Sequence, residues 1–151
     1  MLNEVSDELD TTEWDERMDP EILAVRVDIQ LAIRVDLCMA IKKWNLAAEI
    51  SKYLVEKYPD QPQWWVHWAN ALKEMEKVEE AKDVAMRGLK MHRDVTAIHF
   101  NIACYDSLMG RFRSARKRLN RAIKLNPRLR VLSINDPDLA GLWNRYGTSK
   151  T

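Results

Sequence analysis

The residue types that most often carry out catalysis or bind metals are few and scattered in this chain. His67, His92 and His99 occur without an H-E-x-x-H motif, and Cys38 and Cys104 lie far apart in the sequence. Neither the phosphate-binding motif G-x-x-x-x-G-K-[ST] nor the nucleophile motif G-x-S-x-G is present. We therefore predict a protein that is not an enzyme, with no catalytic residue, no metal site and no cofactor. His67 and His99 are expected at contacts between helices, and both cysteines are expected to be buried, reduced thiols.

A basic stretch is the strongest concentration of charge. No acidic residue occurs between Asp106 and Asp136, and basic residues spaced three and four apart would form one face of a helix: Arg113, Arg116, Lys117, Arg121 and Lys124. This basic face has three interpretations: a solvated surface whose long stems cover apolar groups, a contact with an acidic segment or partner, or a contact with nucleic acid phosphates.

The composition favours helices. Of 151 residues 46% are hydrophobic, with only four glycines and five prolines, which indicates an all-α chain with one domain. Residues 1–21 contain nine Asp or Glu against one basic residue, so residues 1–18 are predicted to be an acidic, flexible arm. Trp14 in this arm is predicted to dock in the protein's own groove or on a partner. No export signal or membrane-spanning segment is evident, so we expect a cytoplasmic protein without membrane contact.

The first predicted helix begins at Asp19-Pro20-Glu21 and extends to about Ile41. Asp19 can accept hydrogen bonds from free backbone N–H groups, and proline is favoured at the first helical position. Apolar residues recur every four positions and predict one apolar stripe: Val25, Ile29, Ile33, Leu37 and Ile41, with Ala32 and Ala40 alongside.

A pattern with a period of 34 residues organises the remainder of the chain. Ala47, Ala81 and Ala115 share one column of this repeat. Trp44, Val78 and Phe112 stand three residues earlier, and Val55, Leu89 and Ile123 stand eight residues later. Helices are expected over 46–57 and 63–75, the first ending before Tyr58-Pro59. Three such helical hairpins are the minimum for a stable stack.

These columns resemble the tetratricopeptide repeat family. Residues 96–127 match it best, through Asn101-Ile102-Ala103-Cys104-Tyr105 and through Gly110, Phe112, Ala115, Ala122 and Pro127. The second copy keeps Trp65 and Trp68 as core residues but has Gly88 where alanine is usual and Glu76 in place of the turn glycine. In the first copy Arg34 occupies a place that is normally apolar.

The resemblance implies a right-handed α-α superhelix. The implied organisation is an arm over 1–18, a repeat domain over 19–145 and a disordered tail over 146–151. Repeats are expected at about 28–61, 62–95 and 96–129, followed by a capping helix at about 137–145. This helix would cover the last repeat.

The resemblance also implies a concave groove lined by the first helix of each repeat. Its inward-facing side chains would be Ala32, Asp36, Met39, Gln63, Val66, Asn70, Lys73, Ala97, Phe100, Cys104 and Ser107. Some members clamp a carboxylate with lysine and asparagine, but Val66 and Ala97 stand where those lysines would be, so no dicarboxylate clamp is expected. The implied function is an adaptor, scaffold or chaperone-like module, a type III secretion chaperone being one specific form. It would bind an unidentified peptide or protein, as a monomer or a homodimer.

Overall fold

The chain is a stack of helices. The computed structural model describes residues 19–147, and every regular element within them is helical. The elements are α3 (Pro20–Ala40), α4 (Trp44–Lys57), α5 (Pro62–Glu74), α6 (Val78–Met91), α7 (Thr96–Leu108), α8 (Phe112–Leu125), α9 (Leu129–Ile134), the 3-10 helix η1 (Pro137–Leu139) and α10 (Ala140–Tyr146). No helix in this part of the chain is long and apolar enough to cross a membrane.

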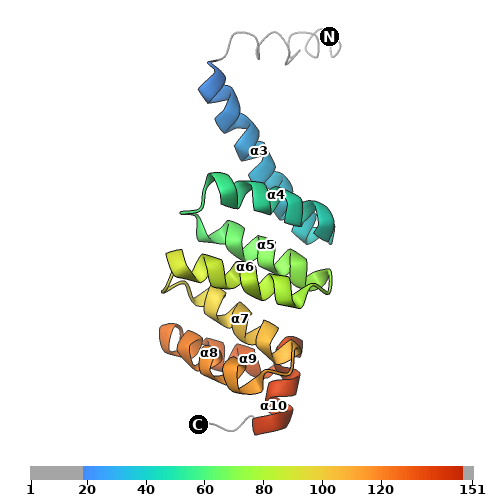
Figure 1. Ribbon diagram of the computed structural model, residues 1–151, viewed down its shortest axis with the longest axis vertical. Coiled ribbons are helices and arrows are strands. Elements are labelled where there is room, and N and C mark those ends of the chain that lie inside the picture. Colours follow the sequence, from blue (N-terminus) through green and yellow to red (C-terminus); the bar gives the residue numbers. More distant parts are fainter. Residues whose placement is uncertain (1–18, 148–151) are drawn as a thin grey trace, which may run out of the picture.

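The helices pair in chain order into three hairpins. α3 with α4, α5 with α6, and α7 with α8 follow one another along the longest axis (Figure 1). Together they form a right-handed superhelix, which confirms the predicted all-α fold class. Residues 1–18 and 148–151, including Trp14 and most of the predicted tail, lie outside the described residues. Tyr146, which we assigned to that tail, is instead the last residue of α10.

Local sequence signals set several helix ends. Asp19 caps α3 by accepting a hydrogen bond from the backbone N–H of Glu21 at 2.8 Å, as predicted. α4 ends at Lys57, ahead of Pro59, and α5 begins at Pro62. The predicted start of α4 at Leu46 is wrong by two residues, because this helix begins at Trp44.

The three hairpin turns have the same geometry. Lys42, Glu76 and Gly110 occupy the same place in the repeat and have φ angles of 61°, 63° and 72°, in the left-handed region. The next residue in each turn, such as Lys77, donates its backbone N–H to a carbonyl five residues earlier. These hydrogen bonds measure 2.8 to 2.9 Å and satisfy carbonyls at the end of the first helix. The turn therefore persists in the second repeat although a glutamate replaces the usual glycine.

Small residues allow the helices of each hairpin to pack closely. Ala47, Ala81 and Ala115 are completely buried, as the repeat columns predicted. Trp65 and Trp68 are also core residues, as expected. Gly88 faces Trp65 so closely that a Cβ atom added to the glycine would lie 2.9 Å from Cβ and Cγ of the tryptophan. The glycine at this usually alanine position is thus explained by the bulk of Trp65.

The predicted apolar stripe of α3 is not its packed face. Val25, Ile29, Ile33, Leu37 and Ile41 are all more than half exposed within the described structure. The opposite face packs instead: Val35 is buried against Ile50 and Leu54 of α4, with Leu31 and Ala32 at the edge of this cluster. α3 is apolar on two faces, so periodicity alone did not show which face enters the core.

A buried carboxylate fastens α3 to α4. Asp28 accepts hydrogen bonds from the Tyr53 hydroxyl at 3.0 Å and from the Tyr58 hydroxyl, and it pairs with the Lys57 ammonium at 2.5 Å. Burial alone would raise the pKa of Asp28, but the hydrogen bonds from Lys57, Tyr58 and Tyr53 outweigh it and lower this pKa. The negative charge of Asp28 therefore helps to hold the first hairpin together.

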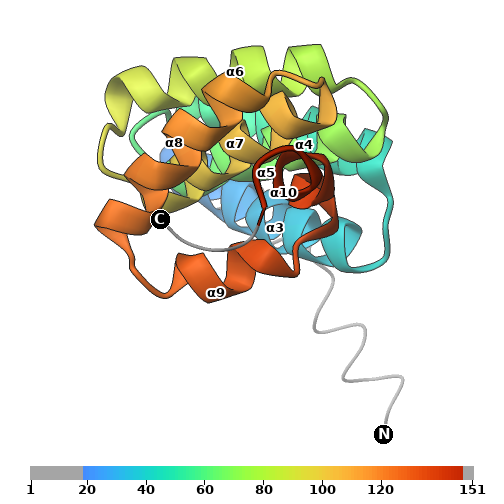
Figure 2. The same ribbon diagram turned by 90° about the horizontal axis from the view of Figure 1, so that it is seen from below.

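The C-terminal segment caps the stack. Asp136 accepts a hydrogen bond from the backbone N–H of Asp138 at the start of η1, and α10 packs against α7 and α8 at the end of the superhelix (Figures 1 and 2). Gly141 permits this approach, because a Cβ atom there would lie 3.0 Å from the ring of Phe112. The capping helix was expected, whereas the short α9 before it was not.

Candidate binding groove

The first helices of the three hairpins converge on one recess. Its volume is about 260 Å³, and it is lined by Met39 of α3, Trp44 at the start of α4, Asn70, Lys73 and Glu74 of α5, and Phe100, Asn101, Cys104 and Tyr105 of α7, together with Asp136 and Asp138. The last two residues bring the C-terminal segment into the groove. The recess therefore combines aromatic side chains, amides and charged groups from distant parts of the chain.

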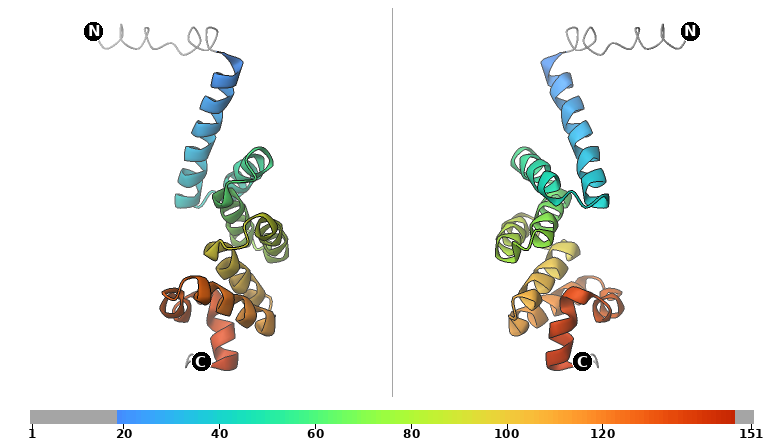
Figure 3. Two further views of the ribbon diagram at one scale, coloured as in Figure 1. Left: turned by 90° about the vertical axis from the view of Figure 1, so that its left-hand side faces the viewer. Right: turned by 90° about the vertical axis from the view of Figure 1, so that its right-hand side faces the viewer.

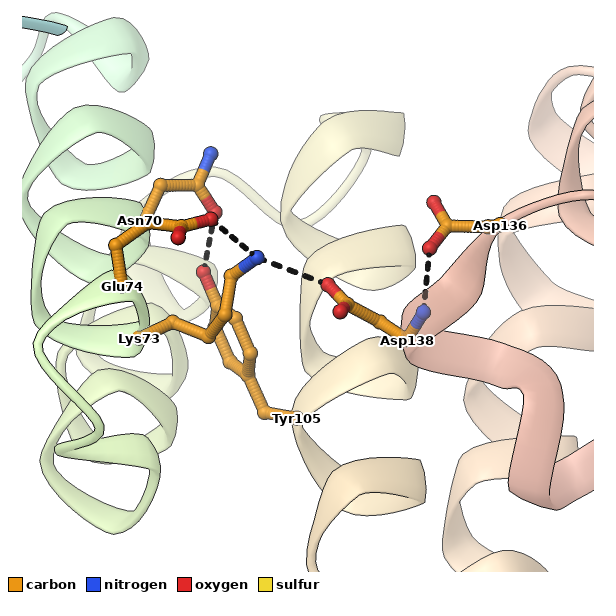
Figure 4. A network of polar contacts seen from close by, with 6 residues as sticks. All are labelled: Asn70, Lys73, Glu74, Tyr105, Asp136 and Asp138. Atoms are coloured by element: carbon orange, nitrogen blue, oxygen red, sulfur yellow. Dashed lines mark hydrogen bonds and ion pairs between the residues drawn. The ribbon is translucent and has the colours of Figure 1, made fainter. Parts of the chain in front are cut away.

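A polar network crosses the floor of this recess (Figure 4). The hydroxyl of Tyr105 donates to Oδ1 of Asn70 at 2.6 Å, which satisfies the polar end of an almost fully buried tyrosine. The ammonium of Lys73 lies 3.0 Å from Oδ2 of Asp138 and 2.8 Å from Oε1 of Glu74. These contacts join α5 to α7 and to the C-terminal segment, so the groove is held in one shape before any ligand arrives.

Carboxylates outnumber ammonium groups in the recess. Burial disfavours the charged form of Lys73, but hydrogen bonds to Glu74 and Asp138 outweigh it and raise the pKa of this lysine. Lys73 therefore stays charged at neutral pH and offsets one of the three carboxylates of Glu74, Asp136 and Asp138. The recess keeps a negative balance.

Comparison with known proteins identifies the fold. No protein-family model matches the sequence, and no curated protein matches it. The first TPR of Spaghetti (RPAP3), bound to the HSP90 peptide SRMEEVD, is 14% identical with a TM-score of 0.65, over 78% of this chain and 88% of that one. PcrH in complex with the chaperone binding region of PopD is 18% identical with a TM-score of 0.60, over 87% and 90%. The chain has the tetratricopeptide repeat (TPR) fold.

A third TPR structure covers more of this chain. The TPR2AB domain of yeast Sti1, in a complex with pHSP90, is 15% identical with a TM-score of 0.66 over 99% of this chain. This chain spans 55% of that one. At such low identities the likeness concerns the arrangement of the helices, and the groove residues must be judged by their own chemistry.

The TPR groove contains some of the predicted binding residues and not others. Met39, Asn70, Lys73, Phe100 and Cys104 all line the recess. The remaining six predicted residues do not line it: Ala32, Asp36, Gln63, Val66, Ala97 and Ser107. Asp36 is exposed and lies 3.4 Å from Nε2 of His67, at a contact between α3 and α5. Ser107 is buried where Gly141 of the capping helix approaches it, and its role in partner binding stays a prediction.

One group in the recess has the residue types of a metal site. The thiol of Cys104 and carboxylate oxygens of Asp136 and Asp138 lie within 4.8 Å of one another. Metals bind the thiolate, but burial, reinforced by these two carboxylates, raises the pKa of Cys104 well above its usual value. Lys73 already neutralises Asp138. The chemistry of this group therefore favours a neutral thiol over a metal ligand.

The predicted basic face extends into a broad hollow on the other side of the last repeat. All five predicted residues of α8 are exposed, and Arg121 pairs with Asp94 at 3.3 Å. Arg113 and Lys117 line a hollow of about 980 Å³ whose other lining residues are Gly110, Arg111, Phe112, Ser114, Arg145 and Tyr146. None of these lining residues is acidic. The guanidinium of Arg116 lies over the ring of Tyr146, 4.9 Å from its centre.

Sequence reasoning missed the residues that the C-terminal segment contributes. Asp136 and Asp138 line the TPR groove, and Arg145 and Tyr146 border the basic hollow. Asp136-Pro137 signalled the start of a helix, but nothing in that signal indicated where the helix would lie. The acidic content of the groove was therefore underestimated.

Proposed function

We propose that this protein is a non-enzymatic interaction module, an adaptor, scaffold or chaperone-like protein, that binds a peptide segment of a partner protein in its TPR groove. The observation that carries the proposal is the recess in which side chains of all three hairpins and of the C-terminal segment meet. Because packed helices and the Tyr105–Asn70 hydrogen bond already fix its walls, little conformational entropy is lost when an extended or helical segment enters.

The neighbours with this fold support peptide binding. RPAP3 is bound to an HSP90 peptide, and PcrH is bound to the chaperone binding region of PopD. Binding of a partner segment by this chain would be comparable.

The charge of the recess selects the ligand. Three carboxylates face one ammonium, so a lysine or arginine side chain is favoured over a carboxylate. Trp44, Phe100 and Tyr105 also line the recess, where aromatic rings can contact the aliphatic stem and the cation. The preferred segment therefore carries at least one exposed basic residue, and an acidic tail is disfavoured.

Peptide display on the whole 151-residue chain, followed by fluorescence anisotropy with the enriched peptides, tests the proposal. Enriched sequences should be basic, and Asn101→Trp should abolish their binding by filling the recess. Glu74→Lys should weaken binding on the order of tenfold or more through charge. Asp83→Lys makes the same charge change at an exposed site on α6, outside the lining of the recess, and should leave affinity unchanged.

Two results would separate the parts of this proposal. If enriched peptides bind Asn101→Trp as well as they bind the natural protein, binding does not use the groove. If acidic peptides bind instead and Asn101→Trp blocks them, the groove is correct and the charge preference is wrong.

The basic hollow supports nucleic acid binding as the second candidate function. Four cationic residues, Arg111, Arg113, Lys117 and Arg145, line it without an acid, although Glu79 pairs with Arg111 at 3.0 Å. Affinity for generic RNA and DNA should be measured between about 50 and 200 mM salt, where phosphate contacts weaken steeply. Binding that falls with salt and is lost in Arg113→Glu would favour this candidate, and no binding at low salt would exclude it.

A further inference from the structure

The apolar face of α3 that stays outside the core is a continuous ridge. We define the α3 ridge as Ile22, Val25, Ile29, Ile33, Leu37 and Ala40, which lie three or four residues apart and so share one side of the helix. Its five large side chains are 53% to 65% exposed. Figures 1 and 3 show α3 extending beyond the other helices, with its N-terminal half uncovered by any segment between residues 19 and 147. A monomer rarely exposes so many large apolar side chains in one line.

The spacing of the ridge is the same from both ends. Along the chain the steps between its residues are three, four, four, four and three, so the pattern is symmetric about Leu31. Two copies of α3 placed antiparallel around a twofold axis at this position would put Ile29 of one copy beside Ile33 of the other. Val25 would meet Leu37, and Ile22 would meet Ala40. A twofold interface requires such self-complementarity.

The charges beside the ridge fit the same arrangement. With the axis level with Leu31, Arg26 of one copy lies opposite Asp36 of the other, both within α3. Opposite charges therefore face each other on both sides of the axis, which fixes register and suppresses other pairings. A parallel pairing would instead place each of these charges beside its own kind. The charge pattern thus selects the antiparallel orientation.

The ridge is large enough for a specific contact. Each large side chain exposes on the order of 100 Å², so pairing two ridges removes roughly 1,000 Å² from water, near the lower bound of specific interfaces.

We propose that the α3 ridge binds the α3 ridge of a second copy of this chain, giving an antiparallel, twofold homodimer. The inference does not depend on the function of the groove. α3 contacts its own α4 through the opposite face, centred on Val35, so dimerisation leaves the hairpins unchanged. The groove recess, whose only α3 residue in its lining is Met39, stays accessible in both copies.

Sedimentation equilibrium of the whole 151-residue chain tests the dimer. The natural protein should dimerise in the micromolar range or below, and Ile29→Asp should weaken dimerisation on the order of 100-fold because it buries a charge at the centre of the contact. Helicity and thermal stability of the monomeric variant should be retained, since Ile29 is exposed in the single chain. Val131→Asp, at an equally exposed apolar site on α9, is the matched control and should dimerise normally.

Cysteine cross-linking tests the orientation in a chain that keeps the rest of the ridge. Val25→Cys mixed with Leu37→Cys should give the mixed disulfide under mild oxidation, because only residues brought within about 7 Å can be bridged. Each variant alone should cross-link to itself far less.

Four outcomes would overturn the proposal. They are a monomer at every concentration up to about 100 μM, a dimer that persists in Ile29→Asp, a dimer that Val131→Asp also disrupts, and preferential cross-linking of Val25→Cys to itself. A chain that dimerises only after deletion of residues 1–18 would show that its own N-terminal segment covers the ridge, and this would also refute the homodimer.

Discussion

Replacing Gly88 with alanine should destabilise the protein, although alanine is the better helix former. The new Cβ atom would lie 2.9 Å from Cβ and Cγ of Trp65 and 3.1 Å from Cδ2, distances that require a shift of the neighbouring atoms. The ring is not free to yield. Its Nε1–H donates to the carbonyl of Pro59 at 2.9 Å, and the guanidinium of Arg87 lies over it, 5.4 Å from its centre.

Two opposing terms decide the size of the effect. Alanine gains about 1 kcal/mol over glycine from helix propensity. Overpacking of a close contact in a core costs roughly 1 to 3 kcal/mol, and the fixed ring places Gly88 in the upper part of that range. The net loss in the free energy of unfolding should be about 1 to 2 kcal/mol, which corresponds to a decrease in Tm of about 2–8 °C.

Urea and thermal unfolding followed by circular dichroism measure this change directly. The corresponding position in the third repeat supplies the opposite substitution: Ala122 is fully buried, so Ala122→Gly should also destabilise, by at least about 1 kcal/mol. If Gly88→Ala instead raises Tm, helix propensity outweighs the contact with Trp65, and the packing explanation for this glycine is refuted.

Three further perturbations have defined outcomes. The pKa of Asp28 is lowered from 3.8, so its stabilising charge is present above that value and is lost as pH falls through the folded pKa. Asp28→Asn should therefore lower the free energy of unfolding near neutral pH. In urea titrations at several pH values, the variant should also lose less stability on acidification than the natural protein does. Lys73→Met should release Asp138 and lower the local stability of the C-terminal segment by on the order of 1 kcal/mol. Amide exchange over 136–142 should become faster. Unchanged exchange would contradict the role of Lys73 in fastening this segment. Cys104 and Cys38 should react slowly with a thiol reagent near pH 8 until urea unfolds the chain. Both thiols are buried, and burial raises the pKa of Cys104. Rapid labelling of the native protein would contradict the burial of these thiols.

The repeat architecture was predictable because its signals are local and recur. Small residues at Ala47, Ala81 and Ala115 mark where paired helices meet, and prolines or turn residues mark where they end. The left-handed turn at Glu76 forms without a glycine, so the turn geometry of the repeat is kept although the residue type changes. Matching positions one period apart therefore carried more information than the residue at any one of them.

α3 shows where periodicity stops being informative. Both of its faces are apolar, and the apolar pattern of a single helix does not show which face meets the next helix. The buried Asp28 was the discriminating residue, because Tyr53 of α4 and Tyr58 directly after it make its burial favourable. Hydrophobic periodicity assigns a helix face that contains a carboxylate to the solvent-exposed side, so it predicted the wrong packed face for α3.

The groove was predictable only in outline. Positions such as Asn70 and Lys73 follow from the repeat register, but the acids that face them come from residues after the last repeat. Their arrival depends on the path of the chain through α9 and η1, which no local signal determines. The location of the candidate site was thus readable from the sequence, whereas its charge was not.

The cap at the C-terminal end also limits how these molecules can assemble. A solenoid with two bare, matching ends could add subunits head to tail without closure and grow into filaments. Here α10 blocks growth at one end, while its small Gly141 lets the cover sit tightly on Phe112. If the α3 ridge at the opposite end joins two molecules as proposed, the cap would leave no second matching end for further growth.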